Sequence, residues 1–281
     1  MKLIADSGST KITWILTGAD GDTHIAESPG MNPALLTREE IIGTLSALVP
    51  EQWRRAPVED AWIYAAGCRS PRESEALTAA LSIHFPQARV DAASDMLGAA
   101  RALCGNSAGV ACILGTGSNA ALYSPAEGIT LSTPPLGYVL GDEGSGADIG
   151  KAIVNTVLKR VWPPKLCDSF LCDTGLAADT IIQAVYRTSE PNRFLASLTR
   201  WAATNIGLPE VGILITERFT EFLRRNVLTL PGADSLPVSF TGSVAHVFSE
   251  QLRAACGICG VTPGKIEKSP AKGLIEYHSK I

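Results

Sequence analysis

Apolar and polar stretches alternate along the 281-residue chain in the rhythm of an α/β protein. Short apolar runs at 2–6, 11–17 and 22–28 are separated by polar turns, which predicts an antiparallel meander. Beyond it, runs typical of buried strands alternate with apolar spacing near 3.6, which is typical of helices. The expected elements are a helix at 37–48, a strand at 61–66, a helix at 72–85, a strand at 88–94 and a helix at 95–103.

The same order begins again in the second half of the chain. Strands are expected at 109–114, 119–123 and 129–133, helices from 144 to 226, a last strand at 238–240, and a helix from Ser243. Two rounds of this order predict an α/β fold with two mixed sheets flanked by helices. The length suits two domains of about 100–200 residues each.

Two small-residue turns, Gly8-Ser9-Thr10 and Gly115-Thr116-Gly117, lie between the first two strands of each half. Glycine lets the backbone approach an anion, and N–H groups and small hydroxyls at the end of a sheet can bind phosphate. Gly150-Lys151-Ala152 fails the P-loop pattern, and residues 115–120 match a dinucleotide fingerprint that should open a helix, whereas a strand follows. A phosphate clamp divided over two similar halves is the better interpretation.

Acidic residues at three places in the sequence bear on whether the protein only binds a ligand or also catalyses a reaction. Asp6 ends the first strand, where it could hold Mg²⁺ through water or close the turn as an Asx-turn. Asp95 follows a strand and opens a helix, so it could face a ligand or cap the helix. The run Gly141-Asp142-Glu143-Gly144-Ser145-Gly146 has more acids than capping requires, and we interpret it as a hydroxyl-binding loop.

Composition excludes several classes of partner. A net charge of -4 leaves no basic field for nucleic acid, and no apolar run approaches the roughly 18 residues of a membrane span. The seven cysteines are scattered, and the pair Cys256/Cys259 lacks a second pair for zinc. We expect a cytoplasmic protein with reduced thiols, no nucleic-acid partner and no membrane partner.

Five ordered motifs carry a family resemblance. They are ADSGSTK at 5–11, DMLGAARAL at 95–103, ILGTGSN at 113–119, LGYVLGDEGSG at 136–146 and FTGSVA at 240–245. Together they resemble the N-acetylglucosamine kinase branch of the BadF/BadG/BcrA/BcrD-type ATPases in the actin/hexokinase/Hsp70 superfamily. That branch includes kinases of N-acetylmuramic acid.

The resemblance implies two ribonuclease-H-like, actin-like ATPase domains with an interdomain cleft for ATP and sugar. It places the first domain at 1–113 plus 266–281 and the second at 114–265. The implied activity is Mg²⁺- and ATP-dependent phosphorylation of the 6-hydroxyl of a small-molecule amino sugar, N-acetylglucosamine and/or N-acetylmuramic acid. The implied role is salvage of cell-wall sugars in peptidoglycan recycling, carried out by a homodimer.

The resemblance also assigns roles to residues. The catalytic base is Asp95, and the magnesium residue is Asp6. The ATP phosphate loops are Gly8, Ser9, Thr10 and Lys11, with Gly115, Thr116 and Gly117; the adenosine loop is Thr241, Gly242 and Ser243, although relatives often have paired glycines there. The sugar-binding residues are Asn32, Asp95, Ser118, Asn119, Gly137, Tyr138 and Asp142.

Two alternatives remain open at this stage. Some relatives are ATPases that activate a dehydratase through an iron–sulfur cluster, and the Cys256/Cys259 pair would suit that chemistry. A non-enzymatic sugar-responsive sensor would keep the clamp without turnover. Arg69 and Arg72 are candidates for a lactyl carboxylate by position only, and solvated loop arginines are the favoured interpretation.

Overall fold

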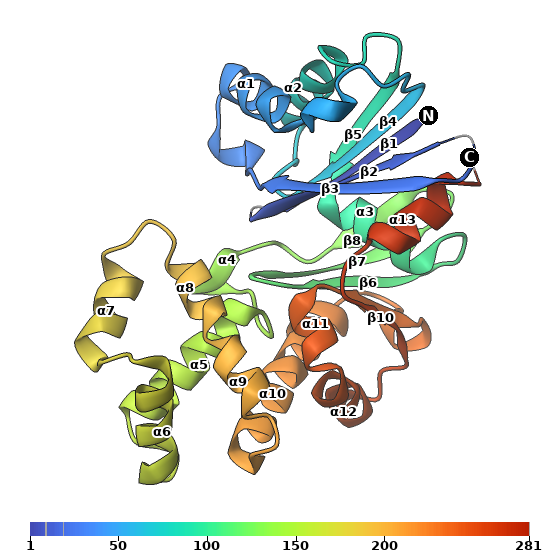
Figure 1. Cartoon of the computed structure of the whole chain (residues 1–281). Coiled ribbons are helices and arrows are strands. Elements are labelled where there is room, and N and C mark those ends of the chain that lie inside the picture. Colours follow the sequence, from blue (N-terminus) through green and yellow to red (C-terminus); the bar gives the residue numbers. More distant parts are fainter. Residues whose placement is uncertain (9, 19, 281) are drawn as a thin grey trace. The chain divides into compact units, whose positions relative to one another are not determined.

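The computed structural model describes residues 1–8, 10–18 and 20–280 and confirms the α/β class (Figure 1). Its contacts divide the chain into two compact units, 1–105 with 270–281, and 106–269. The sequence-based domain limits at 113/114 and 265/266 run through two strands that lie whole in the second unit. The domain limits at 113/114 and 265/266 stay a prediction.

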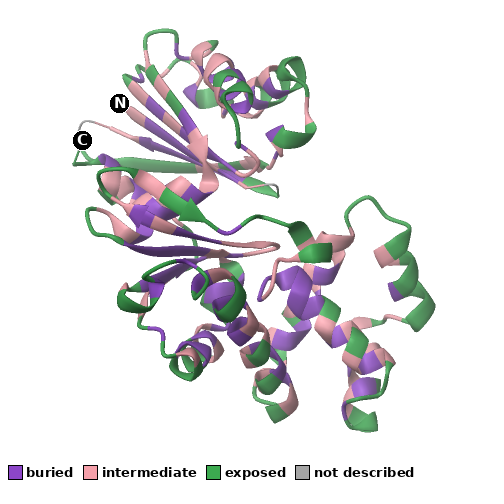
Figure 2. Cartoon of the chain, turned by 180° about the vertical axis from the view of Figure 1, so that it is seen from behind, coloured by how far each residue is buried: buried purple, intermediate pink, exposed green. Residues whose placement is uncertain are grey.

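The first unit is a five-stranded mixed sheet between two layers of helices. Its elements are β1 (Lys2–Ser7), β2 (Lys11–Thr17), β3 (Thr23–Pro29), η1 (Pro33–Leu35), α1 (Arg38–Leu48), η2 (Glu51–Trp53), β4 (Asp60–Ala65), α2 (Pro71–Ser82), β5 (Arg89–Ser94), α3 (Asp95–Cys104) and α13 (Ala271–His278). Leu3 and Ala5 of β1 pack in the cluster that α1 and α2 cover, and Ile4 packs in the cluster beneath α3 and α13. Purple ribbon in Figure 2 marks these buried strands.

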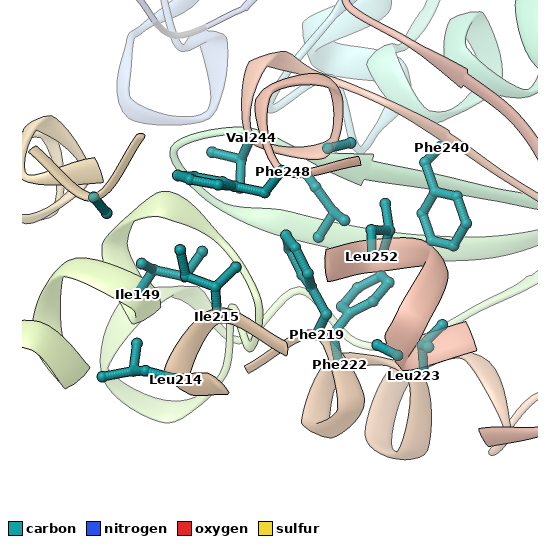
Figure 3. Packing of buried hydrophobic residues seen from close by; sticks show 14 of the residues in the cluster. Ile149, Leu214, Ile215, Phe219, Phe222, Leu223, Phe240, Val244, Phe248 and Leu252 are labelled. Atoms are coloured by element: carbon teal, nitrogen blue, oxygen red, sulfur yellow. The ribbon is translucent and has the colours of Figure 1, made fainter. Parts of the chain in front are cut away.

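The second unit repeats the sheet and adds many more helices. Its elements are β6 (Gly109–Leu114), β7 (Ser118–Ser124), β8 (Gly128–Ser132), α4 (Gly137–Leu140), α5 (Gly146–Leu158), α6 (Pro164–Thr174), α7 (Ala178–Tyr186), α8 (Pro191–Ser197), α9 (Thr199–Thr204), α10 (Pro209–Phe222), the π-helical turn η3 (Leu223–Val227), η4 (Ala233–Ser235), β9 (Val238–Thr241), α11 (Ser243–Val247), α12 (Ser249–Cys259) and β10 (Pro263–Glu267). Figure 3 shows its core, where Phe219 and Phe222 of α10 pack near Phe240 of β9 and Leu252 of α12.

The two sheets have the same topology, which confirms the predicted repeat. Their strand orders are β3-β2-β1-β4-β5 and β8-β7-β6-β9-β10. Each begins as an antiparallel meander and continues through two parallel strands. The turns after β1 and after β6 therefore occupy equivalent places in the two sheets.

Two sequence-based expectations in the last third of the chain were wrong. The strand near 238–240 is not the last, because β10 follows it and pairs with β9 in parallel. Pro263 and Gly264 hid this strand, since both residues are rare in strands and Pro is tolerated at the first residue of an edge strand. The helix expected from Ser243 is interrupted at Phe248, which separates α11 from α12.

The last helix, α13, is attached to the first unit by a polar network around His278. The Nε2 atom of His278 lies 2.9 Å from the Tyr64 hydroxyl, which also accepts a hydrogen bond of 2.7 Å from Arg101. Tyr64 accepts from Arg101 and can donate its own proton to Nε2 of His278, with the direction of that second bond set by the imidazole tautomer. The imidazole stacks on Trp62 with ring centroids 3.9 Å apart.

This network makes the docking of α13 dependent on pH. Burial, with the charges of Arg101 and Lys2, lowers the pKa of His278 to about 3, so the unfolded chain binds the proton first as pH falls below about 6.5. The contribution of His278 to the free energy of unfolding is therefore complete above pH 6.5. It decreases as the pH falls toward 3, by up to about 1.4 kcal/mol per pH unit.

We expect His278→Gln, which keeps an acceptor but does not titrate, to flatten the pH dependence of the unfolding midpoint between pH 6.5 and 4.5. Thermal unfolding followed by circular dichroism measures it. His24→Gln is the matched control, since His24 is exposed on β3 of the same unit. An equal effect of both variants would contradict this role of His278.

Candidate functional site

The first unit brings Asp6 and Asp95 to one edge of its sheet. Asp6 lies near the carboxyl end of β1, and Asp95 follows the end of β5, with β4 between these parallel strands. Asp6 alternates with Ala5 and so shares the face of Ile4, the face that α3 covers. Both carboxyl groups are only partly exposed. The structure thus joins two acids that are about ninety positions apart in sequence.

Capping does not account for Asp95. The N-cap of α3 is Ser94, whose hydroxyl accepts from the Leu97 N–H at 3.2 Å. Asp95 is the first helical residue, and one of its carboxylate oxygens accepts from the Met96 N–H at 2.9 Å. Because a neighbour already supplies the cap, the second oxygen is available for another partner.

Asp6 does not form the alternative Asx-turn either. It belongs to β1, where it pairs with Thr13 of β2, and the turn is closed by the Gly8 N–H donating to the Lys11 carbonyl at 2.9 Å. Lys11 directs its ammonium to Glu27 at 2.7 Å. Thr10 is exposed, and Ser9, the other predicted phosphate residue of this turn, lies outside the described residues.

The charge of Asp95 affects the protonation of Asp6. Burial, together with the charge of Asp95 and against that of Lys11, raises the pKa of Asp6 to about 7. Burial also raises the pKa of Asp95, against the Met96 hydrogen bond and the charge of Arg69. Buried carboxyl groups with raised pKa values are typical of catalytic sites, because a base with a pKa near neutrality accepts protons readily at physiological pH.

Asn32 and Arg69 lie near this acidic edge, on the loops that follow β3 and β4. The Asn32 side chain accepts from the Ala34 N–H at 3.2 Å and rests against the backbone of Gly67, where a Cβ atom would overlap its oxygen. Gly67 has φ +82°, which also favours glycine. Arg72 is paired with Glu73 at 2.8 Å, whereas the Arg69 charge acts on Asp95.

In the second unit, the start of α5 holds the Gly115-Thr116-Gly117 turn. The N–H groups of Gly146 and Ala147 donate to the carbonyls of Gly115 and Thr116 at 2.8 and 3.1 Å. Since a trans peptide directs its N–H opposite to its C=O, the N–H groups of Thr116 and Gly117 point away from α5. Two adjacent N–H groups at a glycine turn are suited to binding a phosphate oxygen.

Asp142 has a strained backbone beside this turn. Its φ of 58° is left-handed, a conformation that costs a residue other than glycine about 1 kcal/mol or more. Its carboxylate accepts from the Ser118 N–H at 3.3 Å and lies so close to Gly117 that a Cβ there would be 3.1 Å from it. Burial raises the pKa of Asp142. Strain of this kind is concentrated at functional sites.

The other predicted residues of this unit lie around the same turn. The Ser118 hydroxyl donates to the Glu143 carbonyl at 2.8 Å, and Asn119 accepts from the Ala120 N–H at 2.9 Å. Gly137 and Tyr138 open the short helix α4, which ends directly before Gly141 and Asp142. The predicted sugar residues of the second unit are therefore contiguous in space with its phosphate turn.

The predicted adenosine loop adjoins this turn through the sheet. Thr241 pairs with Ile113 at the end of β6, and Gly242 is pressed against the Leu114 carbonyl, where a Cβ atom would overlap it. Gly242 also has φ +122°, so this position requires glycine. The buried Thr241 hydroxyl has no hydrogen-bond partner among the described residues, and Ser243 is exposed.

Mg²⁺ would have to bind here through few protein ligands. Among residues 1–8, 10–18 and 20–280, no group of three or more His, Cys, Asp or Glu side chains could hold a metal. One carboxylate with water and phosphate oxygens is, however, a usual Mg²⁺ environment. Burial and the charge of Asp95 disfavour the ionised form of Asp6, so a cation bound beside it would stabilise that form, which fits such a site.

The Cys256/Cys259 pair does not resemble a cluster site. Cys256 is buried in the core of the second unit, and burial raises the pKa of its thiol to about 12. Cys259 directs its sulfur to the Thr220 carbonyl at 3.9 Å. A thiol that ionises so reluctantly is a poor metal ligand. The Cys256/Cys259 pair therefore does not support the iron–sulfur alternative.

No protein-family model matches the chain, and no curated protein is significantly similar to it. Among solved structures, a Porphyromonas gingivalis protein described as a "Putative N-acetylglucosamine Kinase" is 42% identical, with coverage of 100% of this chain and 99% of that one and a TM-score of 0.93. The chain belongs to the N-acetylglucosamine kinase-like family. This confirms the resemblance drawn from the five sequence motifs.

More distant structures support the fold of this N-acetylglucosamine kinase-like protein. A Chromobacterium violaceum protein with the same description is 20% identical, with 98% of each chain covered and a TM-score of 0.70. A "putative sugar kinase" of Cytophaga hutchinsonii is 14% identical, with 99% coverage of each chain and a TM-score of 0.51. The fold is that of the actin-like sugar kinases and ATPases. Among the described residues, no helix combines the length and apolar character that a bilayer crossing requires.

Sequence reasoning missed two charged residues of this kinase-like protein, Asp148 and Lys151. Asp148 is buried, and its carboxylate accepts from the Gly144 N–H at 3.0 Å. Lys151 lies 3.6 Å from that carboxylate and donates to the Tyr138 carbonyl at 3.3 Å. The signal available in the sequence was an acid and a lysine three positions apart on a helix, a pattern that ordinary surface pairs share.

Proposed function

We propose that the protein transfers the γ-phosphoryl group of ATP to the 6-hydroxyl of an N-acetylated hexosamine, N-acetylglucosamine and/or N-acetylmuramic acid. The observation that carries the proposal is Asp95, a partly exposed acid with a raised pKa that capping does not explain. The 42% identical Porphyromonas gingivalis protein, described as a putative N-acetylglucosamine kinase, supports the substrate class.

The residues divide the work of phosphoryl transfer between two sets. Asp95 accepts the proton of the attacking hydroxyl and aligns its oxygen, while Asn32 and Asp142 bind other polar groups of the sugar. The N–H groups of the Gly115–Gly117 turn stabilise charge on the phosphate oxygens. This reaction depends mainly on positioning and charge neutralisation, which are what these residues supply.

Asp6 is the residue that would hold Mg²⁺, through water. When bound, the ion neutralises charge on the phosphate oxygens of ATP. The protein would supply the Asp6 carboxylate, and the nearby negative charge of Asp95 would make binding of a cation beside Asp6 more favourable. Lys11 contributes positive charge from the edge of the same turn.

The proposal is tested by measuring ADP release with a panel of acceptors: N-acetylglucosamine, N-acetylmuramic acid, N-acetylmannosamine and glucose. We expect turnover with an N-acetylated hexosamine to exceed that with glucose by about tenfold or more, because polar groups aimed at a substrate amide discriminate strongly against its absence. Phosphorylation of N-acetylglucosamine with its 6-hydroxyl removed would contradict the assigned position. ATP and sugar binding without ADP release would favour the sugar-responsive sensor instead.

A role in salvage of cell-wall sugars follows if N-acetylmuramic acid is a substrate. Its lactyl carboxylate needs a cation, and Arg69, which is exposed and whose charge acts on Asp95, is better placed than Arg72, which is committed to Glu73. The homodimer and the cytoplasmic location stay predictions, and sedimentation velocity measures the first of them.

A further inference from the structure

The buried carboxylate of Asp148 and the ammonium of Lys151 form a charge pair next to the loop at residues 137–146. The Asp148 side chain is 5% exposed, and burial of a carboxylate is costly unless cations and hydrogen bonds compensate for it. Arg218 of α10 lies 3.8 Å from one oxygen, and Lys151 of α5 lies 3.6 Å from the other. The Gly144 N–H donates to the Asp148 carboxylate at 3.0 Å. This hydrogen bond holds the part of the loop that follows Asp142.

Lys151 connects the same carboxylate to the part of the loop that precedes Asp142. Its ammonium donates to the Tyr138 carbonyl in α4 at 3.3 Å. Lys151 and Asp148 are three positions apart on α5 and therefore lie on one side of that helix. Both halves of residues 137–146 are thus tied to one charge pair, with Asp142 between them.

We propose that Lys151 is a positioning residue for the sugar. Its hydrogen bond to the Tyr138 carbonyl and its ion pair with the Asp148 carboxylate hold residues 137–146 so that Asp142 can bind substrate. The inference rests on the proposed function, in which Asp142 binds the sugar. Asp142 needs such support because its left-handed backbone is strained, and a strained residue persists only when its surroundings hold it.

The same pair also tunes the electrostatics of Asp142. The charge of Lys151 lowers the pKa of Asp142, and the charge of Asp148 raises it. Loss of the Lys151 ammonium therefore removes the hydrogen bond to the Tyr138 carbonyl. It also removes a charge that favours the ionised form of Asp142. Both effects weaken hydrogen bonding from a sugar hydroxyl to a carboxylate.

The test compares wild type, Lys151→Met, Lys151→Arg and Lys159→Met. Lys159→Met is the matched control, because Lys159 follows α5 at its exposed end. For Lys151→Met we expect KM for the sugar to rise about tenfold while KM for ATP changes less than about twofold, as expected when support for one substrate is lost. Lys151→Arg should restore most of the loss, since Arg keeps the charge and several donors.

Hydrogen–deuterium exchange supplies a readout that needs no substrate. Peptides covering 137–146 should exchange faster in Lys151→Met than in wild type or Lys159→Met, with the rest of the second unit unchanged. Unchanged exchange there, or an equal rise in KM for ATP and sugar, would overturn the inference. If wild type phosphorylates no sugar, the proposed function fails, and the exchange comparison alone decides whether Lys151 positions the loop.

Discussion

Asp95→Asn is expected to lower kcat by about 10²–10⁴-fold, the usual contribution of a general base, while the sugar dissociation constant changes little. Asparagine preserves the shape of the side chain and can still accept from the Met96 N–H, so α3 and its Ser94 cap should stay intact. It cannot take the proton of the attacking hydroxyl. Steady-state kinetics with the best acceptor of the panel, together with calorimetric titration of the sugar, measures the two effects separately.

Asp91→Asn is the matched control for this variant. Asp91 lies on β5, the strand that leads directly into Asp95 and α3, but its side chain is 59% exposed and 4.0 Å from Arg101. The same chemical change there should leave kcat within about twofold, as is usual for exposed positions away from a site. If Asp95→Asn keeps near-normal turnover, or if it loses sugar binding in proportion to turnover, Asp95 is not the base.

The position of Asp95 shows what sequence can and cannot decide about a site. Ser94 and Asp95 both suit an N-cap, and local pattern alone left capping and catalysis equally open for Asp95. The choice depends on which side chain reaches the Leu97 N–H, and backbone geometry sets that. The meander was predictable because glycine-containing turns between short strands are local signals, whereas β10 was not, because Pro263 and Gly264 obscure it.

Lys151 and Arg218 show a second limit of prediction from sequence, which is that contacts between distant helices leave no local pattern. Tyr138, Lys151 and Arg218 are spread over eighty positions, and the packing of α4, α5 and α10 brings Arg218 to Asp148 and the Tyr138 carbonyl to Lys151. Local spacing predicted the Asp142 loop because several glycines and two acids before a helix are unusual. It could not predict the support behind that loop, because the support is made of common charged residues on amphipathic helices.

Asp6→Asn is expected to make the protein more stable above pH 7 and nearly inactive. The pKa of Asp6 is raised to about 7 in the folded state, above its ordinary 3.8, so the folded state binds the proton more tightly. The stability that this gives is complete below pH 4 and is lost as pH rises to 7. Asparagine stays neutral, so its advantage over wild type should grow across that window, to about 1–2 kcal/mol at pH 8 after allowance for partial exposure.

The activity of Asp6→Asn should fall by about 10²-fold or more, because the carboxylate proposed to hold Mg²⁺ through water is lost. Thermal unfolding at pH 4 and pH 8, with and without Mg²⁺ and ATP, measures the stability effect, and the Mg²⁺ dependence of turnover measures the other. Wild type should gain stability from Mg²⁺ with ATP more than the variant does, since the cation compensates for the carboxylate pair.

Asp22→Asn is the control, because Asp22 is exposed in the next turn of the same sheet. A gain in stability that is equal at pH 4 and pH 8 would show that the pKa of Asp6 in the folded protein is not raised above its value in the unfolded chain. Unchanged Mg²⁺ dependence of turnover would remove Asp6 from the magnesium site. The expected combination, more stability with less activity, follows from the proposed roles, because the carboxylate pair that is unfavourable in the free protein would bind the cation and the proton during phosphoryl transfer.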